Sequence, residues 1–231
     1  MNNLALAGTL ATAPSAAFAE LRERPRFWFP FLLVVLSTAA VVYWYYSIVD
    51  VEWLKDVMYG NNPDIQKLPE ADRARALGMF SRGTLLWTSV IGTFVVIPIV
   101  YVLSALYYWL AAKVTKIPLG FKHWFVLTSW SALPAVIGTV VTAILLVTSS
   151  NSQIGPGVLA PLSLNELVLH RPFGSPGQSL LDVIGIPALL SWALAIIGVR
   201  TWSGRSLGFS TIFVLLPAVV IYGIWAAIAF K

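Results

Sequence analysis

Glu166 and His170 are the residues whose types and spacing most suggest metal chemistry. They lie four apart in LSLNELVLH, a segment that we expect to form a short helix, so both side chains would fall on one face. A carboxylate and an imidazole are ligands that Zn²⁺ accepts. The available third ligands are Asp50, Glu52 and Asp56. One Glu and one His at this spacing are common by chance, so we interpret the segment as a capped surface helix and predict no metal.

Catalytic groups are scarce in this sequence. It contains no cysteine, which excludes thiolate nucleophiles, disulfides and cysteine metal sites. Its two histidines, His123 and His170, fall on opposite sides of the membrane in the topology given below, so they share no site. No glycine-rich phosphate loop follows a strand. We therefore predict a protein that is not an enzyme and that carries no cofactor.

Basic residues offer the clearest candidate binding chemistry. Eight of them fall in three segments that contain only two acids, Glu20 and Glu23. Each Lys or Arg near a membrane surface contributes about 1 kcal/mol of attraction to anionic headgroups. The predicted lipid- or partner-binding residues are Arg22, Arg24, Arg26, Lys113, Lys116, Lys122, Arg200 and Arg205. Because they are scattered among loops and form no cluster in sequence, nucleic-acid binding is not expected.

The elements that must position these residues are membrane-spanning helices. The run from Gly83 to Ala112 has no charge, and a helix of about 30 residues is longer than the hydrocarbon slab of a bilayer is thick. The whole chain is 58% hydrophobic and 11% charged, whereas soluble domains carry about 25% charged residues. We predict an all-α polytopic membrane protein, a bundle of five spans at about 29–48, 83–112, 124–147, 180–199 and 209–230, with kinks at Pro98 and Pro134.

The segment 1–28 is predicted to be cytoplasmic and interfacial, ahead of a membrane domain over 29–231. An amphipathic helix over 14–24 would place Ala17, Phe18 and Leu21 on one face, in the headgroup boundary. A cleavable signal peptide is not favoured, because no basic residue precedes the thin apolar part.

Two connections are longer than the others. In the connection 50–82 we expect a turn at 61–64 and a helix that starts at Pro69 and runs into the second span. The connection 149–177 is rich in Gly, Pro and Ser and holds the helix around Glu166.

Loop charges give the orientation. The amino end and the loops 113–122 and 200–208 lie on one side with eight basic residues, while the other side has seven basic and eight acidic residues. The first set of loops is shorter and so denser in Lys and Arg. By the positive-inside rule the amino end is cytoplasmic and the carboxyl end is outside.

Small polar residues are the main polar groups inside the spans. The only acid there, Asp182, lies about one turn into the fourth span. Secondary transporters usually place ionisable groups near the midplane, so active transport is not favoured. Serines and threonines such as Ser89, Thr93, Ser129 and Thr142 either line a pore or help helices to pack, and we favour packing.

Three stretches resemble one family. The segment 13–34, APSAAFAELRERPRFWFPFLLV, is a Pro-led helix before an aromatic-Pro span start. The segment 107–138, YYWLAAKVTKIPLGFKHWFVLTSWSALPAVIG, is a span end, a basic loop with Gly and a span with Ser-Ala-Leu-Pro. The segment 192–220, WALAIIGVRTWSGRSLGFSTIFVLLPAVV, has Gly-x-Arg, a tight loop and another span. In this order they resemble the bacterial branch of the Yip family, the Ypt/Rab-interacting membrane proteins.

This resemblance implies five spans with a cytoplasmic amino end, in a bacterial inner membrane with the carboxyl end periplasmic. Eukaryotic members of the family are associated with small GTPases and vesicle traffic. The long amino-terminal region and the Asp-Leu-Tyr-Gly-Pro type signature that they carry are not found here, so GTPase binding is not carried over.

Together, the residues and the resemblance favour a non-enzymatic membrane scaffold that binds lipid or partner proteins. Membrane lipids, other membrane proteins and a second copy of the chain are the expected partners. The alternative is a channel or permease for ions or a small solute, with a polar path opened by the proline kinks.

Overall fold

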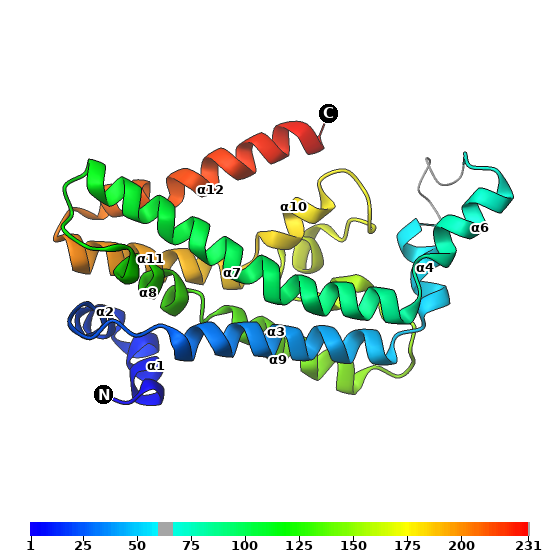
Figure 1. Ribbon diagram of the computed structural model, residues 1–231, viewed down its shortest axis with the longest axis horizontal. Helices are drawn as coiled ribbons and strands as arrows, with labels where there is room; N and C mark the ends of the chain where they lie inside the picture. Colours follow the sequence, from blue (N-terminus) through cyan, green and yellow to red (C-terminus); the bar gives the residue numbers. More distant parts are fainter. Residues whose placement is uncertain (60–66, 231) are drawn as a thin grey trace. The chain divides into compact units, whose positions relative to one another are not determined.

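The computed structural model describes residues 1–59 and 67–230 (Figure 1). Among these residues the regular structure is helical, apart from one isolated bridge between Ser163 and Gly185. The helices are α1 (Asn3–Thr12), α2 (Pro14–Glu23), α3 (Trp28–Ile48), α4 (Val51–Tyr59), α6 (Glu70–Gly78), α7 (Arg82–Val114), α8 (Phe121–Ser131), α9 (Ala135–Thr148), α10 (Gln178–Val183), α11 (Ile186–Ser203) and α12 (Leu207–Ala229). A 3₁₀ turn covers Pro156–Leu159 and a π-helical turn covers Asn165–Leu169.

Five helical segments of the described chain are long and apolar enough to cross a membrane. They are α3, α7, the pair α8–α9, α11 and α12. Large apolar side chains on these helices face outward, among them Ile91 on α7 and Ile212 on α12 at 58% and 67% exposure. In water such surface would be costly, whereas lipid tails accept it. The all-α polytopic fold predicted from the sequence is therefore confirmed.

The contacts divide the chain into two compact units. Unit 1 comprises Met1–Val34, Val96–Ala135 and Pro187–Ile228, and unit 2 comprises Val35–Val95 and Val136–Ile186 with the last residues of the chain. All eight predicted binding cations belong to unit 1, where Glu20 and Glu23 are the only acids in its sequence.

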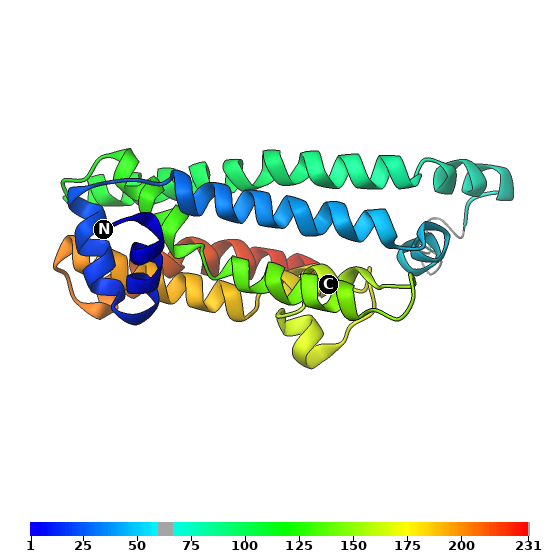
Figure 2. The ribbon, with the colours of Figure 1, turned by 90° about the horizontal axis from the view of Figure 1, so that it is seen from below.

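An aromatic core holds unit 1 together. Trp124, Trp130 and Trp202 are fully or almost fully buried, and so is Phe18 from α2. The indole of Trp130 donates a hydrogen bond to the Arg26 carbonyl, which fastens α8 to the segment between α2 and α3. Helices α1 and α2 run across the direction of α3 (Figure 2).

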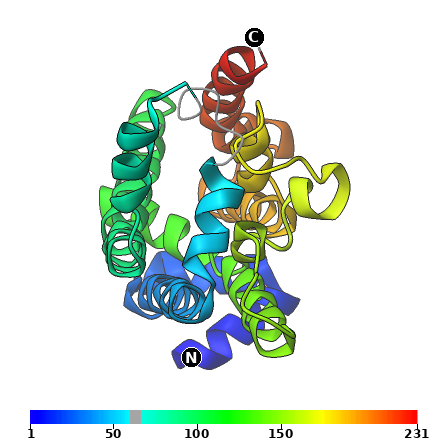
Figure 3. The same cartoon turned by 90° about the vertical axis from the view of Figure 1, so that its right-hand side faces the viewer.

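Unit 2 is held by hydrogen bonds from side chains to distant main-chain carbonyls. Tyr45 on α3 donates to Ile154 at 3.0 Å, and Thr142 on α9 donates to Val158 at 2.9 Å. Both bonds fasten the start of the 149–177 connection to a span. Beyond the end of α3 the chain turns through Asp50 into α4, which leaves the axis of α3 at a large angle (Figure 3).

Several elements differ from the expectations. The helix over 14–24 forms as α2, but Ala17, Phe18 and Leu21 are buried against protein. They cannot also lie in the headgroup boundary. A further helix, α1, precedes it and begins where the Asn2 side chain accepts a hydrogen bond from the Ala5 amide.

The prolines act differently from one another. The chain leaves the helix at Ala132–Pro134, so α8 and α9 are separate, whereas α7 continues through Pro98. The fourth span begins at Ile186, because α10 ends at Val183 and Gly185 pairs with Ser163. Likewise α6 ends at Gly78 and does not run into α7. The turn predicted at 61–64 lies outside the described residues.

Candidate functional site

A basic pocket of about 290 Å³ lies in unit 1. Three of the eight predicted cations line it: Arg22, Lys116 and Arg205. They come from three separate elements, namely the last turn of α2, the loop after α7 and the loop between α11 and α12. The rest of the lining is Ile117, Pro118, Thr201, Trp202, Ser203 and Gly204. We call this the basic pocket.

Backbone geometry shapes the two loops of the basic pocket. Lys116 has φ 59° and Gly204 has φ 66°, so both adopt the left-handed conformation that turns the chain after a helix. At Gly204 the missing side chain makes this conformation easy, whereas Lys116 adopts it at a steric cost. The Arg205 guanidinium joins the two loops, because its Nη2 donates to the Thr115 carbonyl at 3.0 Å.

Trp202 is the buried aromatic residue in the lining of the pocket. The Trp202 ring is 2% exposed, and its indole nitrogen donates to the Phe18 carbonyl at 2.6 Å. The Phe18 ring meets Trp202 edge to face at 6.0 Å, and the Trp124 ring lies 5.9 Å from it on another side. The indole bond therefore ties α2, the element that carries Arg22, to α11.

The side chains that surround the pocket favour anions. No Asp or Glu is among the residues that line it. The Ser203 hydroxyl adds a hydrogen-bond donor, whereas the Thr201 hydroxyl already donates to the Ile197 carbonyl at 2.8 Å. Arg205 also lies 5.1 Å from the Phe209 ring, which limits its rotamers. Three cations and the Ser203 hydroxyl in one hollow are the groups that bind phosphate or carboxylate.

The other five predicted cations lie outside the basic pocket. Arg26 is paired with Glu20, which also accepts from the Met1 ammonium at 3.0 Å. The hydrogen bond from that ammonium, together with the charges of Met1 and Arg26, lowers the pKa of Glu20. Lys113 places its ammonium 3.8 Å from the centre of the Trp109 ring. The remaining three, Arg24, Lys122 and Arg200, are exposed.

The sequence did not indicate the neutral members of the pocket. Thr201 and Ser203 have no unusual spacing, and Ile117 and Pro118 are apolar residues with no charge to mark them. Gly204 within TWSGRSLG was the one available signal, since a glycine after a helix typically marks a left-handed turn.

The alternative metal site does not have the geometry assumed for it. Residues Asn165–Leu169 form a π-helical turn, so positions four apart do not align as they do on an α-helix. His170 follows with φ 50°, and its Nδ1 lies 3.2 Å from the Val168 carbonyl. Within residues 1–59 and 67–230 there is no group of three metal-ligating side chains.

Hydroxyls in the spans mostly bond to their own helix. Thr93 donates to the Ser89 carbonyl, Ser129 to Phe125 and Ser131 to Leu127, in each case four residues back. Such bonds satisfy the hydroxyl within the helix. They favour the packing interpretation over a pore.

Comparison with known families matches the Yip1 domain to residues 7–228, which is nearly the whole chain. No curated protein and no solved structure matches.

Proposed function

The chain belongs to the Yip1 domain family of integral membrane proteins, and on that premise we propose that it is a non-enzymatic scaffold that holds anionic lipid headgroups in the basic pocket. The observation that carries this proposal is the convergence of Arg22, Lys116 and Arg205 on one hollow with no acid in its lining. The hydrogen bond from Trp202 to the Phe18 carbonyl supports it, because this bond ties α2, which carries Arg22, to α11, which precedes the loop of Arg205.

Charge distribution supports a lipid ligand. Unit 1 has eight cations against two glutamates, and one of these, Glu20, is already paired with Arg26. A surface with this excess attracts anionic headgroups at about 1 kcal/mol per cation. Of the five cations outside the pocket, Arg26 is paired with Glu20 and the other four supply general attraction. The three cations inside the pocket supply a place for one phosphate.

The pocket belongs on the cytoplasmic side in our proposal. The loops that form it are the short, basic ones, which the positive-inside rule assigns to the cytoplasm. The protein would then reside in a bacterial inner membrane with a periplasmic carboxyl end. As a scaffold it would gather anionic lipid and, through it, other membrane proteins or further copies of itself.

Lipid retention tests the proposal. The variant Arg22→Gln/Lys116→Asn/Arg205→Gln removes three charges from the pocket, and Asn suits the left-handed conformation at position 116. The control Arg24→Gln/Lys122→Gln/Arg200→Gln removes two Arg and one Lys that are exposed and outside it.

Both variants and the unchanged protein are purified in detergent with a mixture of anionic and neutral phospholipids, and the retained lipids are counted by native mass spectrometry. We expect the pocket variant to lose at least five times more anionic lipid than the control, which loses only the general attraction. Equal losses in the two variants, with helix content preserved, would show that the pocket binds no headgroup.

A further inference from the structure

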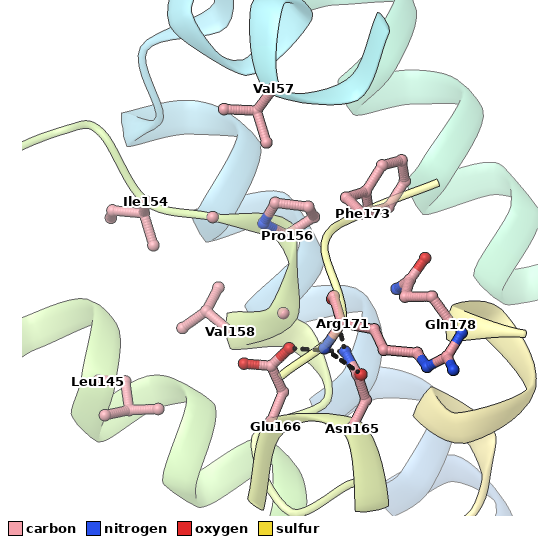
Figure 4. A pocket seen from close by; sticks show the side chains of 12 residues that line it. Val57, Leu145, Ile154, Pro156, Val158, Asn165, Glu166, Arg171, Phe173 and Gln178 are labelled. Carbon is pink, nitrogen blue, oxygen red and sulfur yellow. Dashed lines mark hydrogen bonds between the residues drawn. The ribbon is translucent and has the colours of Figure 1, made fainter. Parts of the chain in front are cut away.

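A second pocket, of about 450 Å³, lies in unit 2 (Figure 4). Its apolar wall comes from α4, α9 and the loop after α9, through residues such as Val57, Leu145 and Ile154. Its polar wall comes from the π-helical turn and the segment that follows it. We call it the mixed pocket, because Glu166 and Arg171 both line it.

Buried amides form the frame of the mixed pocket. Asn165 is 1% exposed and Gln178 is 3% exposed. The Asn165 oxygen accepts from the Arg171 amide at 2.9 Å, and its nitrogen donates to the Arg171 carbonyl and to Glu166 Oε1, both at 3.3 Å. One buried side chain thus fixes the main chain at Arg171 and orients the Glu166 carboxylate.

The two charges of the pocket do not pair with one another. Figure 4 shows the Glu166 carboxylate and the Arg171 guanidinium on opposite sides of Asn165. Arg171 is held away by its own contacts, since Nη1 donates to the Pro176 carbonyl at 2.6 Å and the guanidinium lies 5.3 Å from the Phe230 ring. Opposite charges kept apart in one pocket are the arrangement that receives a zwitterion.

Negative potential around Glu166 has a second source. Gln178 donates to Asp182 on α10, whose other carboxylate oxygen is buried without a hydrogen-bond partner. Burial, followed by repulsion from Glu166, raises the pKa of Asp182. An ammonium group beside Glu166 would relieve this repulsion.

Gly157 fixes where the carboxylate lies. A Cβ added at this position would collide with the Glu166 carboxylate group. The Glu166 carboxylate therefore packs directly against the main chain of the 3₁₀ turn Pro156–Leu159. Because this contact depends on a missing side chain, it can be disturbed without changing any charge.

We propose that the mixed pocket binds the phosphoethanolamine headgroup of a lipid, with the ammonium at Glu166 and the phosphate at Arg171. An ammonium that keeps its hydrogens matches the carboxylate, which accepts hydrogen bonds, better than a choline does. A lipid fits better than a soluble zwitterion, because the apolar wall continues into the outward-facing residues of α9. Ile144 and Val147 there are 55% and 68% exposed.

The test compares headgroups that differ only in the ammonium. The full-length chain in detergent receives phosphatidylethanolamine, its mono- and dimethyl forms, or phosphatidylcholine, and retained lipid is counted by native mass spectrometry. We expect retention to fall stepwise with methylation, at least fivefold overall. In Glu166→Gln, which keeps the acceptor for Asn165, and in Gly157→Ala, which displaces the carboxylate, this preference should shrink below twofold.

Two matched controls show whether the effect is local. Glu70→Gln removes an exposed carboxylate of α6, and Gly92→Ala adds a methyl group in open space on α7. Both should retain the preference of the unchanged protein. The same preference in Glu166→Gln as in Glu70→Gln would overturn the proposal. Equal displacement of the lipid by soluble phosphoethanolamine at matched concentration would overturn the assignment to a lipid.

This inference does not depend on the basic pocket. The two sites lie in different units and differ in the charge of their ligand. The variant Arg22→Gln/Lys116→Asn/Arg205→Gln should therefore lose anionic lipid and still prefer phosphatidylethanolamine over its methylated forms. The two proposals can fail separately.

Discussion

Arg82, the first residue of α7, caps the carboxyl end of α3, where its Nη1 donates to the Tyr46 carbonyl at 2.8 Å. The same guanidinium also reaches the carbonyls of Ser47 at 2.8 Å and Val49 at 2.9 Å. The last carbonyls of a helix have no partner within it and carry the negative end of its dipole. A cation from another helix therefore satisfies both the hydrogen bonds and the charge.

Replacing Arg82 should weaken unit 2. In Arg82→Gln the three carbonyls lose a charged donor, and we expect the free energy of unfolding to fall by about 2 kcal/mol. The measurement is thermal unfolding in detergent, followed by tryptophan fluorescence. Arg75→Gln is the control, because Arg75 is 84% exposed and its ion pair with Asp72 is long at 3.7 Å. An equal loss in both variants would contradict the capping role.

Gly185 should tolerate no side chain. It lies in the bridge with Ser163, where the Leu164 amide donates to the Ile184 carbonyl and the Ile186 amide donates to Leu162. A Cβ at Gly185 would lie 2.8 Å from the Ser163 Cα and even closer to the Leu162 carbonyl oxygen. Because main chain cannot move aside cheaply, Gly185→Ala should cost about 2 kcal/mol. Gly208→Ala, where a Cβ meets nothing within 4 Å, should cost far less in the same unfolding experiment.

Phe18 should be critical for unit 1. Its ring is fully buried beside Trp202, so Phe18→Ala leaves a cavity and removes the edge-to-face contact. We expect a loss of about 3–5 kcal/mol. Phe121→Ala on α8, where the ring is 37% exposed, should lose less than half as much. A similar loss in the two variants would show that α2 is not part of the core.

Acid should loosen the amino-terminal segment through Glu20. Its pKa is lowered in the folded protein by the hydrogen bond and charge of the Met1 ammonium and by Arg26. A lowered carboxyl pKa stabilises the fold above the unfolded value and loses that contribution as pH falls through the folded value. Amide hydrogen exchange of α1 and α2 should therefore speed up between pH 5 and about 3 after correction for intrinsic rates. In Glu20→Gln this acid-induced increase should disappear, whereas Glu23→Gln should retain it.

The spans were predictable because long uncharged runs have no alternative in lipid. The positions at which the spanning helices break were harder to predict, because Pro98 lies inside an unbroken helix while α8 ends before Pro134. Both prolines lie in apolar runs, so their local sequence does not distinguish a proline inside a helix from one at a helix break. Helix α1 was missed because its residues are too weakly periodic to be distinguished from a loop.

The candidate site was half predictable. Composition and loop charge identified eight cations, but not that Arg22, Lys116 and Arg205 converge while Arg26 is neutralised by Glu20. Convergence of residues so far apart in sequence depends on how the loops turn, which rests on left-handed residues such as Lys116 and Gly204. The mixed pocket had one clue in Glu166, which the sequence indicated only beside His170 as a weak metal candidate.

The fit of Glu166 against Gly157 has a consequence for descent. In relatives that keep the pocket, a glycine nine positions before a glutamate should be inherited as a unit. Where a lineage has replaced the glycine, the carboxylate can no longer pack against the main chain, and the glutamate should no longer be conserved. An alignment of the positions of Gly157 and Glu166 would therefore distinguish family members that have the pocket from members that lack it.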